Sequence, residues 1–202
     1  MEKIIFLIRH TEPVLEDKQR RYLGQSDPDL SIAGRQQAEQ LACNMQDQNI
    51  RCVYSSDLKR AAQTALLIAQ RCQLQPIFLT ALREINMGTW EGKSFQEIRE
   101  CDPDGFAARG KDIVKYRPPE GESFLDVQER VLPIFNEIIE KSDGNIAIVA
   151  HGGVNRVILS SLMNIPLDNL FSIRQNYGAV NIIRKKSRTL TVFGINKNLN
   201  CF

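Results

Sequence analysis

The two histidines of this chain are the residues whose placement most directly indicates chemistry. His10 follows the apolar run Ile4 to Ile8 with only Arg9 between them, and His151 directly follows the run Asn145 to Ala150. An imidazole can act near neutral pH as a nucleophile, an acid, a base or a ligand. Core histidines bonded to backbone groups are the plainer alternative. Histidine is rare in this chain, and both histidines follow apolar runs, which favours a shared functional site over two separate core positions.

The two apolar runs are the elements that must position these histidines. Continuous apolar runs without polar alternation are typical of strands buried on both faces of a parallel sheet. Ligands of open α/β sheets bind at the carboxyl ends of the strands. We therefore expect Arg9, His10 and His151 to meet at one end of such a sheet. The glycines after His151 lead into a helix over about 154–163, whose first amides suit an anion.

Arg60 and Glu84 follow two further predicted strands. A short strand over 52–54 precedes a helix over about 58–73, so Arg60 lies in the first turn of that helix. A weaker strand over 75–79 leads to Glu84. The plain alternatives are a solvated helix residue for the arginine and a surface ion pair with the preceding arginine for the glutamate. Placement after strands favours convergence with the histidines instead.

The five groups together indicate phosphoryl chemistry. Two guanidiniums, Arg9 and Arg60, suit the charge and the several oxygens of a phosphate. Their charge lowers the pKa of nearby imidazoles, and a neutral His10 can attack phosphorus. Glu84 can protonate the leaving alcohol and then activate water, while His151 helps to hold the transferred group. The hypothesis requires no metal and no cofactor.

The remaining segments supply covering helices and a hairpin. We expect helices over about 31–45, 95–100, 105–109 and 123–141, with Ser31 and Ser123 at helix starts, and a hairpin from 180–184 and 190–195. Strands that alternate with helices predict an α/β fold with a mostly parallel sheet and an antiparallel edge. We expect a single domain over 1–202, with a cap-like insertion at about 85–121 above the site.

Composition narrows the functional classes. The 202 residues carry a net charge of +2 with both signs interspersed, which favours neither a nucleic-acid surface nor a membrane anchor. The N-terminal apolar run is too short to span a bilayer and lacks a signal-peptide cleavage site. The cysteines are five in number and scattered, without a C-x-x-C pair, which disfavours a disulfide framework or a zinc site. We expect a cytoplasmic protein that binds a small anionic ligand.

Six segments resemble one known family. LIRHTE, YSSDLKRAAQTA, LREINMGTWEG and VAHGG are similar, in this order, to the motifs of the histidine phosphatase superfamily. SDPDLSIAGRQQA and PEGESFLDVQERV are also similar to common stretches of that family. The resemblance implies a phosphoglycerate mutase-like, three-layer α/β/α sandwich. It implies that His10 is the nucleophile, Glu84 the proton donor, and that Arg9, Arg60 and His151 bind phosphate.

The resemblance also concerns the substrate. We expect Thr11, Gln25 and Gly152 to contribute to substrate binding, although the family usually has glycine at position 11. Mutases that use a bisphosphoglycerate cofactor resemble one another in an R-H-G-x-S-x-W-N run, whereas this chain reads RHTEPVLEDK. The chain also lacks room for the longer insertions of those mutases. It looks most similar to α-ribazole phosphatases and other broad-specificity members, and we expect a phosphomonoesterase acting on a small phosphorylated metabolite.

Other functions remain open at this stage. A phosphoglycerate mutase-type phosphotransferase is the nearest alternative, and a non-catalytic module that binds phosphoproteins is a second one. A serine hydrolase is disfavoured because the chain has no G-x-S-x-G motif. Tyr22, Gln25, Trp90 and the segment 97–116 are candidates for substrate selectivity, each with packing as the alternative. The oligomeric state, monomer or homodimer, stays undetermined.

Overall fold

A six-stranded sheet organises the part of the chain that the computed structural model describes, residues 2–15, 19 and 21–198. The strand order is β3-β2-β4-β1-β5-β6. The strands are β1 (Glu2–Arg9), β2 (Ile50–Ser55), β3 (Pro76–Phe78), β4 (Asn145–Ala150), β5 (Val180–Lys186) and β6 (Thr189–Lys197). The first four strands pair in parallel, whereas β5 pairs antiparallel with both β1 and β6. The expected mostly parallel sheet with an antiparallel edge is confirmed.

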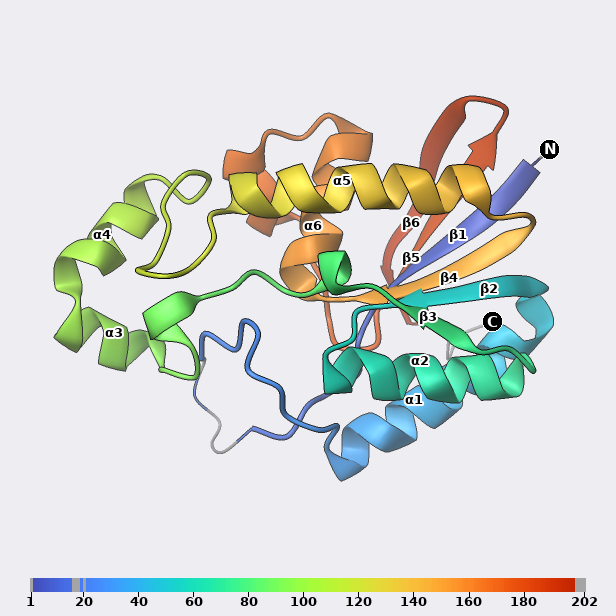
Figure 1. Cartoon of the computed structure of the whole chain (residues 1–202), viewed down its shortest axis with the longest axis horizontal. Coiled ribbons are helices and arrows are strands. Elements are labelled where there is room, and N and C mark those ends of the chain that lie inside the picture. Colours follow the sequence, from blue (N-terminus) through green and yellow to red (C-terminus); the bar gives the residue numbers. More distant parts are fainter. Residues whose placement is uncertain (1, 16–18, 20, 199–202) are drawn as a thin grey trace.

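Helices cover both faces of the sheet (Figure 1). On one face lie α1 (Ile32–Met45) and α2 (Lys59–Arg71), and on the other lie α5 (Phe124–Lys141) and α6 (Gly152–Met163). Successive strand residues point to opposite faces, so Phe6 and Ile8 of β1 pack with α1 and α2. Ile5 and Leu7 pack with α5 and α6. The three-layer sandwich follows from this double burial.

Serine side chains cap the first turns of two helices, as their positions in the sequence predict. Ser31 caps α1, since its Oγ accepts a hydrogen bond from the Gly34 amide at 2.9 Å. Ser123 and Asp126 form a capping box at the start of α5. The helix after β4 begins at Gly152, two residues before the expected start, because both glycines adopt helical backbone. Short 3₁₀ helices span Gln46–Gln48, Thr80–Leu82, Gly88–Trp90 and Leu167–Ser172.

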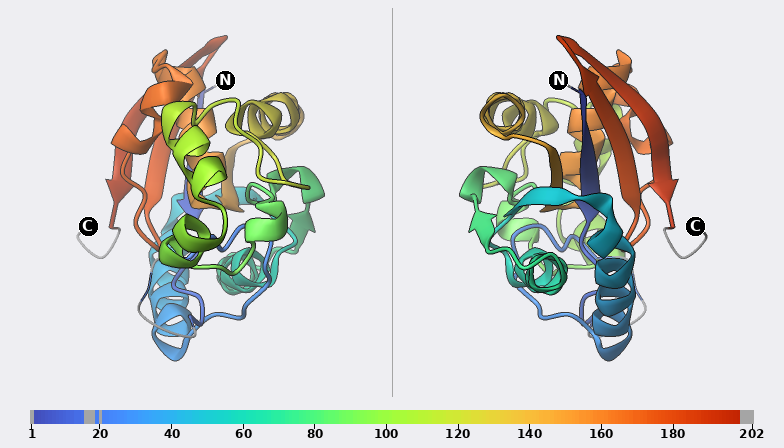
Figure 2. Two further views of the ribbon diagram at one scale, coloured as in Figure 1. Left: turned by 90° about the vertical axis from the view of Figure 1, so that its left-hand side faces the viewer. Right: turned by 90° about the vertical axis from the view of Figure 1, so that its right-hand side faces the viewer.

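The segment 85–121 lies beyond the carboxyl ends of the parallel strands (Figures 1 and 2). It contains α3 (Phe95–Cys101) and α4 (Pro103–Lys111). Trp90, which the sequence offered as a selectivity residue, is only 1% exposed and packs against the rings of Tyr22 and Tyr116 at centroid distances of 5.2 and 5.6 Å. Its indole N–H donates to Asp102 Oδ2 at 3.1 Å. Trp90 is therefore a core residue that joins this segment to the domain.

Two further predictions, on disulfides and on membrane-spanning helices, are compared here with the described part of the chain. Cys43, Cys52, Cys72 and Cys101 are free. Cys201, and residues 16–18 of the RHTEPVLEDK run, lie outside the described residues. Among the described helices, none has the length and apolar character that crossing a bilayer requires.

Candidate active site

His10 and His151 lie side by side at the carboxyl ends of β1 and β4. The parallel register pairs Arg9 with Ala150, so the residue after each strand reaches the same place. The two ring centroids are 5.1 Å apart with a 59° angle between the planes. Both side chains are buried, with 2% of His10 and none of His151 exposed. The sheet topology thus brings the only two histidines of the sequence together.

The surroundings of His10 define its tautomer. Nδ1 lies 2.7 Å from the Thr11 carbonyl oxygen, which can only accept, so Nδ1 carries the hydrogen. Nε2 accepts a hydrogen bond from Arg60 Nε at 3.2 Å, which requires a free lone pair there. Burial holds the pKa of His10 well below its usual value, and the charges of Arg60 and Arg9 lower it further. The ring is therefore neutral, with its lone pair on Nε2.

Arg60 is a buried cation fixed by backbone carbonyls. Its two Nη atoms donate to the carbonyl oxygens of Ser26 and Gly24 at 2.5 and 2.6 Å. The carboxylate of Glu91 holds this loop by accepting from the Gln25 amide at 2.7 Å and the Ser26 amide at 2.9 Å. Gly24 has a φ of +43°, and a Cβ there would lie 2.1 Å from Glu91 Oε1. Only glycine fits this turn without displacing Glu91.

Two further guanidiniums flank Gly152. Arg9 donates to the Gln175 carbonyl at 2.6 Å, and its Cζ lies 4.0 Å from the centroid of the Tyr177 ring. A Cβ at Gly152 would lie 3.0 Å from Arg156 Nη1 and 3.4 Å from Arg9 Nε. Arg9 Nε is buried and finds no hydrogen-bond partner among the described residues. The start of α6 is thus bordered by two cations on one side.

His151 has no hydrogen-bond partner for either ring nitrogen within residues 2–15, 19 and 21–198. Burial holds the pKa of His151 well below its usual value, with Arg60 as the next cause. Buried polar atoms are nearly always satisfied in proteins, so the unpaired imidazole and the unpaired Arg9 Nε make this the expected position of a ligand. The cations around it favour an anionic ligand.

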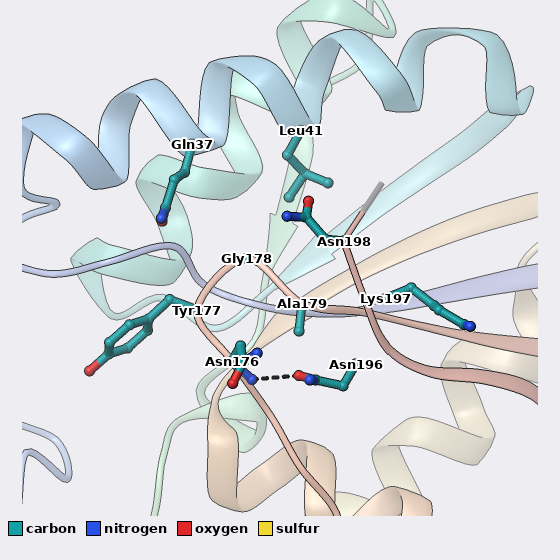
Figure 3. A pocket seen from close by; sticks show the side chains of 9 residues that line it. All are labelled: Gln37, Leu41, Asn176, Tyr177, Gly178, Ala179, Asn196, Lys197 and Asn198. Atoms are coloured by element: carbon teal, nitrogen blue, oxygen red, sulfur yellow. Dashed lines mark hydrogen bonds between the residues drawn. The ribbon is translucent and has the colours of Figure 1, made fainter. Parts of the chain in front are cut away.

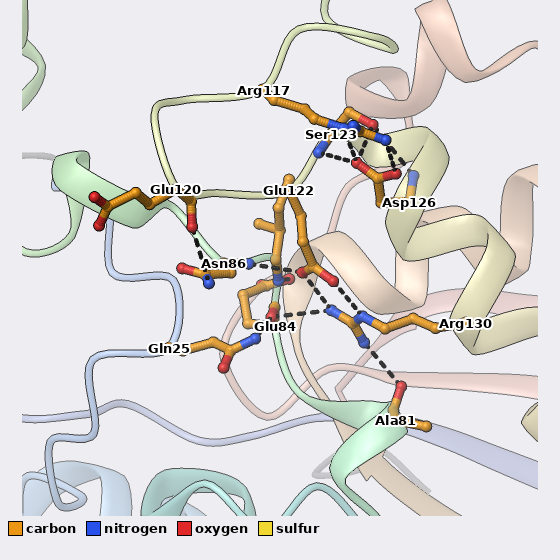
Figure 4. A network of polar contacts seen from close by, with 11 residues as sticks. Gln25, Ala81, Glu84, Asn86, Arg117, Glu120, Glu122, Ser123, Asp126 and Arg130 are labelled. Carbon is orange, nitrogen blue, oxygen red and sulfur yellow. Dashed lines mark hydrogen bonds and ion pairs between the residues drawn. The ribbon is translucent and has the colours of Figure 1, made fainter.

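Glu84 borders the same place from the opposite side. Its Oε2 accepts from the Gly153 amide at 3.0 Å, so the expected anion site at the start of α6 is partly filled by this carboxylate. Its carbonyl oxygen accepts from Gln25 Nε2 and Arg130 Nη2, both at 3.1 Å. Arg130 is in turn paired with Glu122 through two contacts of 2.8 and 2.9 Å (Figure 4).

The plain alternatives for Glu84 and Arg60 are not what the structure shows. Arg83 pairs with Asp57 at 2.7 Å and not with Glu84. Arg60 is only 1% exposed, so it is not a solvated helix residue. Both side chains face one cavity of about 220 Å³. Its lining contains five arginines (Arg9, Arg21, Arg60, Arg109 and Arg156), the single acid Glu84, and an aromatic wall of Tyr22, Phe95, Phe124, Phe171 and Tyr177.

Residues 5–198 match the family model of the histidine phosphatase superfamily, branch 1. The chain belongs to this superfamily. It is 35% identical to a glucosyl-3-phosphoglycerate phosphatase of Mycolicibacterium vanbaalenii, over 74% of this chain and 69% of that protein. It is 33% identical to the "Probable phosphoglycerate mutase GpmB" of Escherichia coli O1:K1, over 80% and 75%. The α-ribazole phosphatase structure from Shigella flexneri superposes with a TM-score of 0.88 at 27% identity, over 96% of both chains.

These findings confirm the predicted family, the fold and the class of enzyme, a phosphatase of the histidine phosphatase type. The roles of individual residues in this histidine phosphatase, and the identity of its substrate, stay predictions. Four of the five groups on which the prediction depended, Arg9, His10, Arg60 and Glu84, line one cavity. His151 is fully buried next to it, in ring contact with His10.

Two residues expected to bind substrate lie behind the cavity and do not line it. The backbone N and the Oγ1 of Thr11 both lie 3.2 Å from Thr64 Oγ1, so this side chain faces α2. The side-chain amide of Gln25 donates a hydrogen bond to the Glu84 carbonyl oxygen. These contacts favour support of His10 and Glu84 over contact with substrate. Gly152 and Tyr22 do line the cavity.

Several residues that line the cavity were not predicted from the sequence. Arg156 lies four residues after Gly152, so helical spacing alone could have placed it on the same face of α6. Arg109 falls within the suspected segment 97–116 but carried no signal of its own. Phe124 and Phe171 read as ordinary apolar residues. Tyr177 lies in an irregular loop where no periodicity indicates orientation.

The loop that carries Tyr177 separates the site from a second cavity of about 220 Å³ (Figure 3). Gly178 donates to the His10 carbonyl at 3.1 Å, and the Asn176 amide donates to Asn196 Oδ1 at 2.6 Å. Figure 3 shows the Tyr177 side chain pointing away from Leu41. The Arg9 guanidinium lies over this ring, 4.0 Å from its centroid. The loop is therefore tied down at both ends and presents one ring to the site.

Proposed function

We propose that this histidine phosphatase is a phosphomonoesterase that forms a phosphohistidine on His10. The observation that carries the proposal is the orientation of its ring, with the hydrogen on Nδ1 directed to the Thr11 carbonyl and the lone pair on Nε2. Nε2 attacks phosphorus, and the bond between phosphorus and the ester oxygen breaks. The Arg60 Nε–H then donates to a phosphoryl oxygen in place of Nε2.

Glu84 serves in both steps. Its carboxyl group borders the cavity beside the start of α6. In the first step it gives its proton to the departing ester oxygen, which leaves as the alcohol. In the second step the carboxylate takes a proton from water as that water attacks the phosphohistidine. Free phosphate leaves, and neutral His10 and protonated Glu84 are restored.

Arg9, Arg60 and His151 hold the phosphoryl oxygens and the charge that develops on them. The unpaired Arg9 Nε and the unpaired His151 ring are buried donors that a phosphoryl oxygen satisfies. Arg156 adds a third guanidinium beside Gly152. We propose that this cationic set performs the reaction without a metal ion or another cofactor.

The substrate is proposed to be a small phosphorylated metabolite. The cavity of about 220 Å³ suits a ligand of modest size. α-Ribazole phosphate is one candidate, supported by the resemblance to the Shigella flexneri α-ribazole phosphatase. The four cysteines that the structure describes are free and scattered, which supports a cytoplasmic setting for this reaction.

A phosphoglycerate mutase-type phosphotransferase is the alternative that a comparison favours, through the relative named for that activity. A mutase must keep its phosphohistidine long enough to return the phosphoryl group to an acceptor. Release of inorganic phosphate at the same rate as alcohol, with no phosphoryl transfer to added phosphoglycerate, supports the phosphatase. A non-catalytic phosphoprotein-binding module would show neither product.

The first test is hydrolysis of p-nitrophenyl phosphate in the presence of EDTA. The wild-type protein is expected to turn over, and His10→Ala to lose at least about 1,000-fold in kcat. Arg35→Ala, at an exposed position on α1 away from the cavity, is the control for handling and folding. Equal turnover by wild type and His10→Ala would refute the nucleophile assignment. Loss of wild-type activity in EDTA that Mg²⁺ restores would refute metal independence.

A further inference from the structure

Tyr177 lies against two residues of the proposed catalytic set. Its ring centroid is 5.5 Å from the ring centroid of His10, with a 45° angle between the planes. The Cζ atom of Arg9 lies 4.0 Å from the centroid of the same tyrosine ring. Tyr177 also lines the cavity that Arg9 and His10 border. None of the family-like motifs of the sequence contains Tyr177, and the proposed reaction steps do not use it.

The hydroxyl group of Tyr177 lies beside the Arg9 guanidinium. Burial lowers the pKa of Arg9, and interaction with this hydroxyl group, partly through a hydrogen bond, opposes the lowering. An arginine can only donate, so the phenol oxygen is the acceptor and its own hydrogen stays available for another acceptor. Arg9 Nε and the ring nitrogens of His151 are buried and unpaired within the described residues. We therefore expect a ligand oxygen bound by Arg9 to meet the Tyr177 O–H as a further donor.

Backbone hydrogen bonds fix the loop of Tyr177 to the end of β1. The Arg9 amide donates to the Ala179 carbonyl at 3.0 Å, and the Gly178 amide donates to the His10 carbonyl at 3.1 Å. These two bonds join the residues directly after Tyr177 to the residues that carry the guanidinium and the imidazole. The tyrosine ring is therefore held in register with both groups.

A buried amide network holds the residues before Tyr177. Gln175 is only 3% exposed, and its Nε2 donates to Asn181 Oδ1 at 2.8 Å. Its Oε1 accepts from Asn181 Nδ2 at 3.0 Å and from Asn155 Nδ2 at 3.2 Å. Asn181 Nδ2 also donates to the Leu7 carbonyl of β1 at 2.9 Å. The Gln175 carbonyl accepts from Arg9 Nη1 at 2.6 Å, so the network fixes the guanidinium together with the loop.

We propose that Tyr177 is a further catalytic residue, whose hydroxyl group donates a hydrogen bond to an oxygen of the transferred phosphoryl group. The inference rests on the proposed function, because transfer to His10 defines where the phosphoryl group lies. Each terminal oxygen of that group can accept more than one hydrogen bond, and donors that are fixed before the reaction stabilise the charge that develops on it. The contact is made to the phosphoryl group and not to the leaving alcohol, so it serves both reaction steps.

The first test removes the hydroxyl group alone. Tyr177→Phe keeps the ring that contacts Arg9 and His10. We expect kcat/KM for p-nitrophenyl phosphate to fall about tenfold, the usual effect of losing one hydrogen bond to a charged group. The dissociation constant of inorganic phosphate, measured by phosphorus NMR titration, is expected to rise by a similar factor.

Tyr54→Phe is the matched control. The Tyr54 hydroxyl group is hydrogen-bonded to Ser142 Oγ at 2.9 Å, and this tyrosine of β2 does not line the cavity. The variant is expected to keep the wild-type kcat/KM and the wild-type affinity for phosphate. In Tyr177→Phe, a change in neither quantity, or in only one of them, would overturn the inference, because a donor to the phosphoryl group must affect both.

A second pair of variants separates direct contact from support of Arg9. In the Arg9→Lys background, Tyr177→Phe is expected to weaken phosphate binding again by about tenfold, because the hydroxyl group still donates to the phosphate. No further weakening in that background would mean that Tyr177 acts only through Arg9, and would overturn direct contact. Full activity of His10→Ala would instead fail the proposed function, whereas phosphate binding needs no turnover and tests Tyr177 independently.

Discussion

At the scale of single residues, the site depends on glycines that let the backbone approach a catalytic side chain closely. Gly153 brings its amide to Glu84 Oε2, and an added methyl group would lie 2.5 Å from Glu84 Oε1. Gly153→Ala is therefore expected to displace the carboxyl group and to lower kcat by about 10- to 100-fold with little change in fold.

Steady-state kinetics beside circular dichroism checks this prediction. Gly110→Ala is the matched control, because it also replaces a helical glycine but its added Cβ meets nothing within 4 Å. Normal kcat in Gly153→Ala would show that the position of Glu84 does not limit the reaction.

At the scale of elements, the Arg130–Glu122 pair fixes the segment that carries Glu84. Arg130 also donates to the carbonyls of Ala81 and Glu84, and Glu122 accepts from the Asn86 amide at 2.9 Å (Figure 4). Arg130→Met removes the guanidinium that links α5 to the backbone carbonyls of Ala81 and Glu84 and to the Glu122 carboxylate. We expect kcat to fall about tenfold while KM changes little, because Arg130 does not line the cavity.

The control for Arg130→Met is Arg117→Met, which breaks the exposed pair between Arg117 and Asp126 in the same region (Figure 4). Surface pairs contribute little, so kinetics within about twofold of wild type are expected. A rise in KM at unchanged kcat in Arg130→Met would contradict a positioning role for this residue.

Some of the helices, strands and site residues could be predicted from the sequence, and others could not. Both histidine-bearing strands and the cap on α1 were predictable, because continuous apolar runs and a serine before a helix act locally. The start of α6 was placed two residues late because glycine has a low intrinsic helix propensity, so the two adjacent glycines indicated a helix that begins after them. Arg109 and Tyr177 could not be assigned, because their orientation depends on packing between segments distant in sequence.

At the scale of the whole molecule, the neutral histidines couple the fold to pH. Both imidazoles have a folded-state pKa well below the ordinary value of about 6.5. Below that pH the unfolded chain therefore binds protons that the folded chain does not. The free energy of unfolding should be constant with respect to these groups above about pH 6.5 and should fall below it, by about 1.4 kcal/mol per pH unit for each histidine.

Urea unfolding at pH 5.5 and 7.5 measures this difference. His151→Asn is expected to remove about half of the loss between the two pH values, whatever its effect on absolute stability. The paired carboxyl group of Asp57, whose pKa Arg83 lowers, contributes only at more acidic pH. Equal unfolding free energies at both pH values would contradict neutral buried histidines.

Detection of the covalent intermediate tests the central claim most directly. Glu84→Gln should slow the water step while p-nitrophenolate still leaves without a proton donor, so the phosphoenzyme should accumulate. The mixture is quenched in alkali, in which phosphohistidine survives, then digested and mapped by mass spectrometry. Phosphate on His10, and none in the His10→Ala, Glu84→Gln double variant, is the expected result. Phosphate on another residue, or turnover with no phosphorylated peptide, would contradict it.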